Sequence, residues 1–581
     1  MRNNPFSSFQ SGADLVSRRP IGGSAHVKGP TSPVLVDLTI GQLLEATVAS
    51  DGDRDAFVFL EHGVRWTWRQ FRDAVDGLVC GLLSLGVERG DRVGIWSPNR
   101  PEWVLVQFAT ARIGAVMVNI NPAYRVSELE YALRKVGVKV LFTAAGLKNS
   151  DYLAMLDEVM PEMAHNLPGQ IASTRLPALK SVVHFGDFYR AGMFSFAQAT
   201  GMGGPAQKAY ATSLQQALSP YDAINVQFTS GTTGHPKGAT LTHHNIVNNA
   251  RFVAKAMRLT AHDRLCVPVP LYHCFGMVLG VLACTSTASC LVFPGESFDP
   301  VATLHSIETE KCTALHGVPT MFVAMLGTPE FGQFDLSTLR TGIMAGSPCP
   351  IETMKRVVSD MHMREVTVAY GMTETSPVSF QSAVDDPLEQ RVSTVGRVQP
   401  GLEVKLVDIH GETVGIGQTG ELWTKGYSVM RGYWGDDART REVIVDGWMR
   451  TGDLATIDED GYCNIVGRLK DMLIRGGENI YPREIEEFLY RHPAIAEVQV
   501  FGVPDNRYGE EICAWVLLKP GTTVTVADLR DFCRGQIAHF KVPRHIRFVN
   551  ALPMTVTGKA QKFVMREAMV KELGLGQEAT A

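Results

Sequence analysis

Residues 229–245 read TSGTTGHPKGATLTHHN, and this stretch decides the fold. Before it, Ile224, Val226 and Phe228 alternate with polar residues, which predicts a half-buried strand. After it, apolar residues recur at helical spacing, with Thr242 as the expected N-cap. The stretch therefore predicts a glycine-rich loop that joins a strand to a helix, as in α/β proteins that bind phosphate.

The composition of this loop predicts a polyphosphate site. Glycines let backbone N–H groups turn toward an anion, Ser and Thr hydroxyls add donors, and a lysine adds positive charge. The candidate residues are Thr229, Ser230, Gly231, Thr232, Thr233, Gly234 and Lys237. The loop matches neither the Walker A nor the G-x-G-x-x-G pattern. A flexible linker is the alternative, but both flanks are strongly patterned.

Length and composition narrow the class of protein. At 581 residues the chain is too long for one compact core, so at least two structural units are expected. A net charge of -5, from 60 acidic and 55 basic residues, offers no basic excess for nucleic acid. The ten cysteines are scattered without a C-x-x-C pair, which argues against zinc and favours buried thiols in a reducing compartment.

Two segments bear on location. Residues 276–293 carry no charge, but their Ser/Thr cluster favours a buried helix and strand over a membrane span. The first thirty residues are rich in Ser, Gly and Arg, and we expect residues 1–37 to be a flexible extension whose first thirty residues are dispensable for activity. The expected location is cytoplasmic. A transit peptide, and with it the mitochondrial matrix, is the alternative.

The pattern of elements changes twice along the chain. Between about 38 and 395, strand-like runs alternate with helical periodicity, which predicts two parallel-type sheets flanked by helices. Residues 395–467 read as short strands and glycine turns, which predicts an antiparallel sheet or a small β-barrel. A small mixed α/β domain is expected over 470–570, followed by a tail at 571–581. The large N-terminal domain then spans 38–468.

Four further motifs accompany the glycine-rich loop. They are YGMTE (370–374), RTGDL (450–454), GRLKDMLIRGGENIYPREIE (467–486) and PMTVTGK (553–559). In order and spacing they resemble the adenylate-forming superfamily, which includes acyl-CoA synthetases, peptide-synthetase adenylation domains and luciferases. The resemblance covers about residues 38–570. The sequences PLYHCFG and IRGGENIYP most resemble those of medium-chain acyl-CoA synthetases of the family-member-2 type.

The resemblance implies an ATP site. It places Tyr370 against the adenine, Thr373 on phosphate and Glu374 on Mg²⁺, tasks that suit an aromatic ring, a hydroxyl and a hard carboxylate. It also implies that Asp453 accepts hydrogen bonds from the ribose hydroxyls and that Arg468 is a second nucleotide contact. Gly346 and Ser347 of AGSP (345–348) are expected to line the adenine and acyl pockets, and Gly371 of YGMTE is expected to belong to the nucleotide site.

The resemblance also implies roles near the C-terminus and at the acyl site. Lys559 is the expected catalytic lysine, because a positioned ammonium stabilises the charge that develops on the α-phosphate. His273 would be a gate between the ATP and acyl sites, and a core histidine is the alternative. Gly476 and Gly477 would line the coenzyme A channel, and Lys470 would be the hinge of a mobile C-terminal domain.

The reaction implied is ATP-dependent ligation of a carboxylic acid to coenzyme A through an acyl adenylate, with Mg²⁺, and the expected acid is a medium-chain fatty acid. An aryl or long-chain acid remains open, as does oligomeric state. A peptide-synthetase unit would place an acid within 268–276, and PVPLYHCFG contains none. A luciferase-like oxygenase and a non-catalytic acyl-nucleotide-binding protein are further alternatives.

Overall fold

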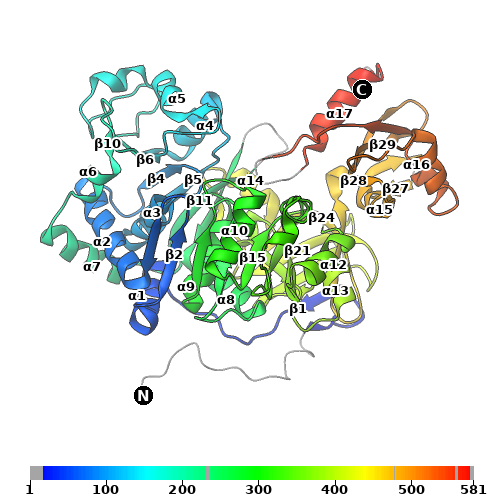
Figure 1. Ribbon diagram of the computed structural model, residues 1–581, viewed down its shortest axis with the longest axis horizontal. Helices are drawn as coiled ribbons and strands as arrows, with labels where there is room; N and C mark the ends of the chain where they lie inside the picture. Colours follow the sequence, from blue (N-terminus) through cyan, green and yellow to red (C-terminus); the bar gives the residue numbers. More distant parts are fainter. Residues whose placement is uncertain (1–17, 230–235, 348, 477, 556–559, 576–581) are drawn as a thin grey trace.

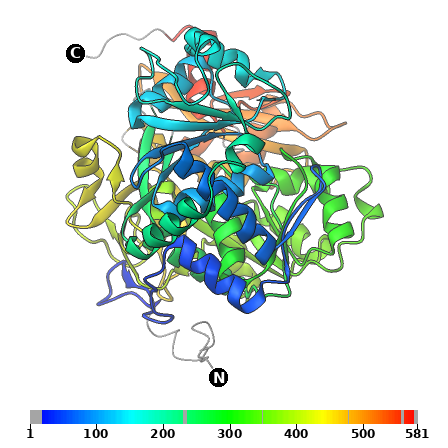
Figure 2. The same ribbon diagram turned by 90° about the vertical axis from the view of Figure 1, so that its left-hand side faces the viewer.

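The computed structural model describes residues 18–229, 236–347, 349–476, 478–555 and 560–575. Two large sheets lie side by side at the centre, and a smaller C-terminal unit projects from one end (Figure 1, Figure 2). The first sheet has eight strands in the order β10 (Phe194–Ser195), β9 (Ser181–His184), β6 (Val138–Thr143), β4 (Arg92–Trp96), β5 (Val116–Ile120), β11 (Ala223–Thr229), β12 (Lys237–Thr242) and β22 (Gly432–Tyr433). It is parallel from β10 to β11 and antiparallel from β11 to β22.

The second sheet has nine strands and is likewise parallel in its centre. Its order is β19 (Arg397–Val398), β18 (Val378–Gln381), β17 (Glu365–Gly371), β16 (Thr341–Ala345), β15 (Ala314–Gly317), β13 (Arg264–Cys266), β14 (Cys290–Phe293), β2 (Asp55–Phe59) and β3 (Val64–Thr67). The strands from β17 to β2 run parallel, and the outer strands are antiparallel. The two parallel-type sheets predicted from the alternating pattern are confirmed.

Helices fill the space between the sheets. The helix α2 (Trp68–Ser84) contacts β2 and β3, whereas α3 (Pro101–Ile113) contacts β4 and β5, and the two helices pack on each other. Pro at N1 begins α3 and Gly114, in a left-handed conformation, ends it. The other helices of the two-sheet region include α1 (Ile40–Asp51), α4 (Val126–Val136), α5 (Tyr152–Val159), α7 (Pro205–Ala217), α8 (His243–Ala256), α9 (Ala283–Thr287), α10 (Pro300–Glu310), α11 (Pro319–Leu326) and α12 (Ile351–Asp360).

The connection after the glycine-rich loop differs from the expectation. The prediction that the loop joins a strand directly to a helix is wrong, because β12 lies between them and pairs antiparallel with β11 from Thr229↔Lys237 to Ala223↔Thr242. The β-branched and apolar residues of GATLT favour this extended conformation. Thr242 is the N-cap of α8, as predicted, and accepts a hydrogen bond from Asn245 N–H at 3.1 Å.

The uncharged segment 276–293 is a buried helix and strand, as predicted. It comprises a π-helix, η3 (Phe275–Leu282), then α9 and the buried strand β14. Among the described residues, no helix is long and apolar enough to cross a membrane.

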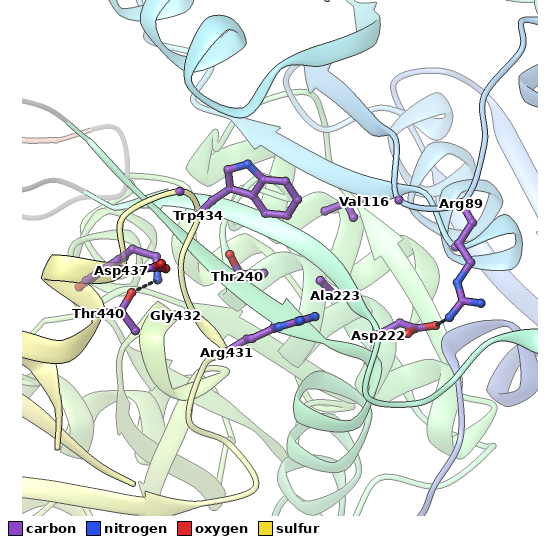
Figure 3. A pocket seen from close by; sticks show the side chains of 14 residues that line it. Arg89, Val116, Asp222, Ala223, Thr240, Arg431, Gly432, Trp434, Asp437 and Thr440 are labelled. Carbon is purple, nitrogen blue, oxygen red and sulfur yellow. Dashed lines mark hydrogen bonds and ion pairs between the residues drawn. The ribbon is translucent and has the colours of Figure 1, made fainter. Parts of the chain in front are cut away.

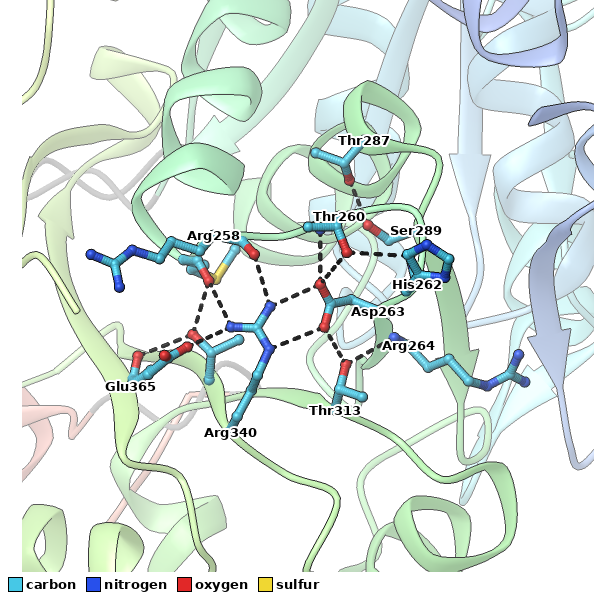
Figure 4. Close-up of polar contacts among 12 residues, drawn as sticks. Arg258, Thr260, His262, Asp263, Arg264, Thr287, Ser289, Thr313, Arg340 and Glu365 are labelled. Carbon is cyan, nitrogen blue, oxygen red and sulfur yellow. Dashed lines mark hydrogen bonds and ion pairs between the residues drawn. The ribbon is translucent and has the colours of Figure 1, made fainter. Parts of the chain in front are cut away.

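A tight polar cluster closes the amino ends of the nine-stranded sheet (Figure 4). The buried Asp263 accepts hydrogen bonds from Arg340 Nη2 at 2.8 Å and from the Thr313 hydroxyl at 2.7 Å. Arg340 also pairs with Glu365 at 2.5 Å. Thr313, Arg340 and Glu365 lie at or just before the starts of β15, β16 and β17. Because this cluster occupies the amino ends of the strands, a ligand can bind at their opposite, carboxyl ends.

The third sheet is antiparallel and overturns part of the expectation for the N-terminus. It contains β1 (His26–Lys28), β20 (Leu402–Val407), β21 (Gly420–Gly426), β24 (Trp448–Ile457), β23 (Ile444–Val445) and β25 (Cys463–Arg468). The expected flexible extension is therefore wrong for residues 24–37. The strand β1 pairs with β20, Ala25 and Val27 are fully buried, and both backbone groups of Val36 bond to Asn248 at 2.8 and 2.9 Å.

Replacing Val27 with aspartate should therefore destabilise the protein. An unpaired carboxylate in this buried position should cost about 3 kcal/mol and lower the melting temperature. The matched control is Lys28→Ala on the exposed side of the same strand, where we expect a change within about 0.5 kcal/mol. Thermal unfolding of both variants measures the difference. Equal melting temperatures would show that β1 contributes nothing to the sheet.

The C-terminal unit has cores of its own. Its sheet contains β27 (Glu478–Ile480), β26 (Leu473–Arg475), β29 (Gly509–Leu518), β28 (Ile495–Asp505) and β30 (His545–Phe548). Three helices, α15 (Pro482–Leu489), α16 (Val526–Cys533) and α17 (Lys562–Glu572), accompany it. The first of its two apolar clusters begins at Leu473, whereas the buried residues of the large cluster in the preceding chain end at Cys463. Arg483 of α15 donates to the carbonyl of Ile465 in β25 and so links the unit to the rest.

Candidate active site

Two sheets contribute to one corner at the carboxyl ends of their strands. Thr229 is the last residue of β11, and its hydroxyl donates to Glu374 Oε1 at 3.2 Å. Glu374 lies in the short helix η5 (Thr373–Thr375), directly after β17. Ligands of open α/β sheets bind at such carboxyl ends. The structure thus brings Thr229, the residue before the glycine-rich loop, to Glu374 of the YGMTE motif.

A tyrosine that the sequence analysis missed completes the acidic part of this corner. The hydroxyl of Tyr433 donates to Glu374 Oε1 at 3.0 Å, and Lys237 Nζ lies 5.1 Å from the centre of the Tyr433 ring. Burial, and then the neighbouring Glu374 carboxylate, raise the pKa of Tyr433, so its hydroxyl remains a donor. In sequence, Tyr433 lies in GYW, between predicted strands, where an isolated tyrosine carries no signal for this contact.

Glu374 presents one carboxylate oxygen to the site. Its side chain is buried, with 6% of the residue surface exposed. Among the described residues, both side-chain hydrogen bonds reach Oε1, from Thr229 and Tyr433. Within the described part of the chain, Oε2 accepts no side-chain hydrogen bond. A carboxylate beside hydroxyls and a lysine suits a cation bridged to phosphate.

The second half of the corner links three predicted nucleotide residues. The Tyr370 hydroxyl donates to Asp453 Oδ2 at 2.6 Å, and Arg468 Nε pairs with Asp453 Oδ1 at 3.2 Å. Asp453 and Arg468 face each other across the β24–β25 pair. Burial and the charge of Asp453 raise the pKa of Tyr370 well above its usual range. The carboxylate is thus held by a protonated phenol and a guanidinium, in one orientation.

Glycines shape the edges of the corner. A Cβ on Gly371 would lie 1.7 Å from the carbonyl oxygen of Pro377, so only glycine fits between β17 and the following turn. Gly346 follows β16 with φ +96°, a conformation that favours glycine. Ser347 is next to it and half-buried. These three predicted residues therefore lie on neighbouring strand ends of one sheet.

His273 lies in a tight turn before the π-helix. The N–H of Phe275 donates to His273 Nδ1 at 3.1 Å. The carbonyl of His273 accepts from the N–H groups of Gly276 and Met277, each at 3.0 Å. A Cβ on Gly276 would lie 2.5 Å from the Pro270 carbonyl oxygen, so the turn requires glycine there.

Some of the remaining predicted residues lie within the described part of the chain, and the others lie outside it. Lys470 is exposed in the short helix η6 (Leu469–Asp471), between β25 and β26. Gly476 has φ +59° at the β26–β27 turn. The others lie outside the described residues: Ser230, Gly231, Thr232, Thr233, Gly234, Gly477 and Lys559.

A cavity of about 490 Å³ lies beside β22 (Figure 3). It is lined by Thr240 of β12, by Arg431, Tyr433 and Trp434, and by residues of neighbouring loops. Of the residues described here for the active site, Tyr433 alone also lines this cavity. The cavity is therefore adjacent to the predicted site but separate from it.

The chain matches two family models. The model of the AMP-binding enzyme matches residues 44–434, and the model of the AMP-binding enzyme C-terminal domain matches residues 484–559. A protein named as an acyl-CoA synthetase, YngI of Bacillus subtilis (strain 168), is 48% identical over 93% of this chain and 99% of its own length. The mitochondrial medium-chain acyl-CoA ligase ACSF2 of Mus musculus is 46% identical over 99% of this chain and 95% of its own length.

Solved structures agree with these matches. The anthranilate CoA ligase AuaEII in complex with anthranoyl-AMP superposes with a TM-score of 0.81 and 27% identity, over 93% of this chain and 98% of its own. ATP-bound MatB from Rhodopseudomonas palustris superposes with a TM-score of 0.75 and 27% identity, over 92% of this chain and all of its own. The predicted resemblance to adenylate-forming enzymes is confirmed, and the chain belongs to the AMP-binding enzyme family.

Proposed function

We propose that this AMP-forming acid–CoA ligase activates medium-chain fatty acids. The carboxylate attacks the α-phosphorus of ATP, an O–P bond forms, and pyrophosphate leaves. The thiol of coenzyme A then attacks the acyl carbonyl and AMP leaves. The corner at 370–374, where Tyr370 meets Asp453 and Glu374 meets Thr229, supports the use of ATP, and the names of the ACSF2 relatives support a medium-chain acid. The corner suits a nucleoside at one end and phosphates at the other.

In this proposal each half of the corner binds one part of ATP. The two oxygens of Asp453 accept hydrogen bonds from the ribose hydroxyls, and Tyr370 packs against the adenine. Thr229, Lys237 and the loop between them hold the phosphates through hydroxyl, ammonium and backbone N–H donors. Holding the acid beside ATP in this way makes the first step effectively intramolecular.

The residues at Glu374 fit a magnesium ion. Mg²⁺ in nucleotide sites binds through one or two carboxylates together with substrate phosphates and water. Glu374 offers one buried carboxylate, and Thr229 adds a hydroxyl. When bound, the ion would neutralise charge on the phosphates of ATP. Glu374 and Thr229 therefore orient the phosphate end, and Lys559 is proposed as the cation on the α-phosphate.

The acid should be identified by a series of graded length. Each added buried methylene contributes about 0.8 kcal/mol, so kcat/KM should rise roughly fourfold per carbon until the pocket ends. We expect an optimum at medium-chain fatty acids, well above acetate. Pyrophosphate release and acyl-CoA formation, measured over straight-chain acids, aryl acids and amino acids, test this expectation. Highest turnover on acetate, an aryl acid or an amino acid would overturn the proposed substrate.

We also propose that the unit from 470 to 570 reorients between the two half-reactions. Lys559 and Gly476 belong to one small unit, and each is needed at the acyl centre in a different step. The short helix η6 separates the apolar clusters of the two units, and Lys470 is exposed within it. Motions about such connectors change a few backbone dihedrals.

Replacing Lys470 with proline should separate the half-reactions. Proline fixes φ and removes the N–H, which should restrict the connector. Acyl-adenylate formation should persist, whereas acyl-CoA formation from a supplied acyl adenylate should slow at least about 10-fold. Lys470→Ala is the control for loss of the side chain alone. If the proline variant performs both half-reactions at the wild-type rate, the connector is not the hinge.

The expected location is the cytoplasm, with the mitochondrial matrix as the alternative. The ACSF2 relatives are named as mitochondrial, whereas YngI is bacterial. Fractionation of cells that express the full chain distinguishes the two compartments.

A further inference from the structure

Three amide side chains form a buried ladder beneath the turn that carries His273. Asn119 lies on β5, and Asn225 and Gln227 lie on β11; each is 2 or 3% exposed. Asn225 Nδ2 donates to Asn119 Oδ1 at 2.9 Å, and Gln227 Nε2 donates to Asn225 Oδ1 at 2.9 Å. Burying amides is costly unless they are hydrogen-bonded, so this ladder is a specific feature of the core.

The ladder contacts the turn at three points. Asn119 Nδ2 donates to the Tyr272 carbonyl at 2.9 Å. The thiol of Cys274 donates to Gln227 Oε1 at 3.2 Å. The sulfur of Met277 accepts from Asn119 Nδ2 at 3.5 Å. Residues on both sides of His273 are therefore held by amides of two adjacent strands.

The hydrogen bonds of the ladder fix the orientation of the Gln227 side-chain amide. Gln227 Nε2 donates a hydrogen bond to Asn225 Oδ1, so the carbonyl oxygen of the Gln227 side chain must face Cys274. Burial raises the pKa of the Cys274 thiol to about 12, so sulfur keeps its proton and donates at neutral pH. Turning the Gln227 amide over would place two donors against each other. The Cys274 thiol and the Gln227 carbonyl therefore form a matched pair.

The same strand face leads to the phosphate end of the site. Side chains two residues apart point to the same face of a strand, so Asn225, Gln227 and Thr229 share one face of β11. Thr229 contacts Glu374 at the far end of this row. One strand thus carries both the contact to the phosphate corner and the contact to the His273 turn.

We propose that Gln227 is a positioning residue, which sets the His273 turn relative to the phosphate strand through Cys274. The proposal rests on the proposed acid–CoA ligase activity and concerns how the acid is placed beside ATP. Loss of the contact should release the turn and misplace the acid. Displacing a bound substrate by about 1 Å can lower the reaction rate up to about 100-fold, so a partial release of the His273 turn should lower the rate by less.

The test compares Cys274→Ala, Cys274→Ser and Gln227→Met with the wild-type enzyme. The alanine variant loses the donor, the serine variant retains a donor, and the methionine variant keeps volume but loses the amide. We expect Cys274→Ala and Gln227→Met to raise KM for the acid, or to lower kcat of adenylation, about 10-fold. KM for ATP should change less than about twofold, and Cys274→Ser should recover most of the loss.

Cys284→Ala provides the matched control, because Cys284 is also fully buried but lies on α9, outside the ladder. It should keep the wild-type KM for the acid, and its melting temperature measures the cost of deleting a buried thiol. The proposal is overturned if Cys274→Ala behaves like Cys284→Ala, if serine rescues nothing, or if KM for ATP and acid rise together. Absence of ligase activity in the wild-type enzyme would instead refute the proposed function.

Discussion

Replacing Lys559 with alanine is expected to slow acyl-adenylate formation about 100- to 1,000-fold. During attack on the α-phosphorus, negative charge grows on the phosphoryl oxygens. A positioned ammonium stabilises that charge more in the transition state than in the ground state. The loss should therefore appear in kcat of the first half-reaction. Pyrophosphate release with acid and ATP measures it.

The second half-reaction separates this role from a general defect. The variant should still convert a synthetic acyl adenylate and coenzyme A to acyl-CoA at close to the wild-type rate, because the thiol attacks the acyl carbonyl and not phosphorus, and Lys559 is proposed to act only on the attack at the α-phosphorus. Lys571→Ala, an exposed lysine in the last turn of α17, is the matched control and should leave both steps unchanged. Equal losses in both half-reactions would contradict the assigned role.

Much of the framework could be predicted because its signals are local. The alternation of strands and helices over 38–395 predicted the two parallel-type sheets, and strands with glycine turns predicted the antiparallel sheet. The prediction of Thr242 as the cap of α8 was correct for the same reason. Periodicity, proline and capping residues act within a few positions of the chain.

The errors arose where partners are distant in sequence. The strand β1 has only three residues, and its partner β20 is almost 400 positions away, so composition alone suggested an extension. The strand β12 was missed because Thr and Gly after a glycine-rich loop resemble a continuation of that loop, whereas pairing with β11 and β22 makes it a strand.

The residues of the active site likewise divide into those that motifs identified and those that only the folded chain brings together. The resemblance assigned Tyr370, Asp453, Thr229 and Glu374 to one nucleotide site, and the structure places Tyr370 beside Asp453 and Thr229 beside Glu374. Tyr433 was missed, because only folding brings β22 to the edge of the sheet beside Glu374. Asn225 and Gln227 were read as the polar face of a half-buried strand, yet both are buried, because Cys274, directly before the π-helix η3, and Met277 within it contact that face.

Replacing Glu374 with glutamine should lower kcat/KM for MgATP by about 100-fold or more. Both hydroxyl contacts, from Thr229 and Tyr433, reach Oε1, and a glutamine carbonyl can accept both without a change of shape. The substitution therefore converts only the remaining oxygen, Oε2, to an amide nitrogen. It removes one negative charge and one ligand atom at the position proposed for Mg²⁺, while the fold should persist.

The magnesium dependence of the reaction distinguishes this role from a structural one. If Glu374 helps to hold the ion, the Glu374→Gln enzyme should require a higher Mg²⁺ concentration for half-maximal adenylation, and added Mg²⁺ should recover part of the rate. Tyr433→Phe keeps the carboxylate but removes one hydrogen bond to Oε1, so its loss should be smaller, about 10-fold or less. An unchanged Mg²⁺ requirement in Glu374→Gln, with an unchanged melting temperature, would remove Glu374 from the ion site and leave it a structural acceptor for Thr229 and Tyr433.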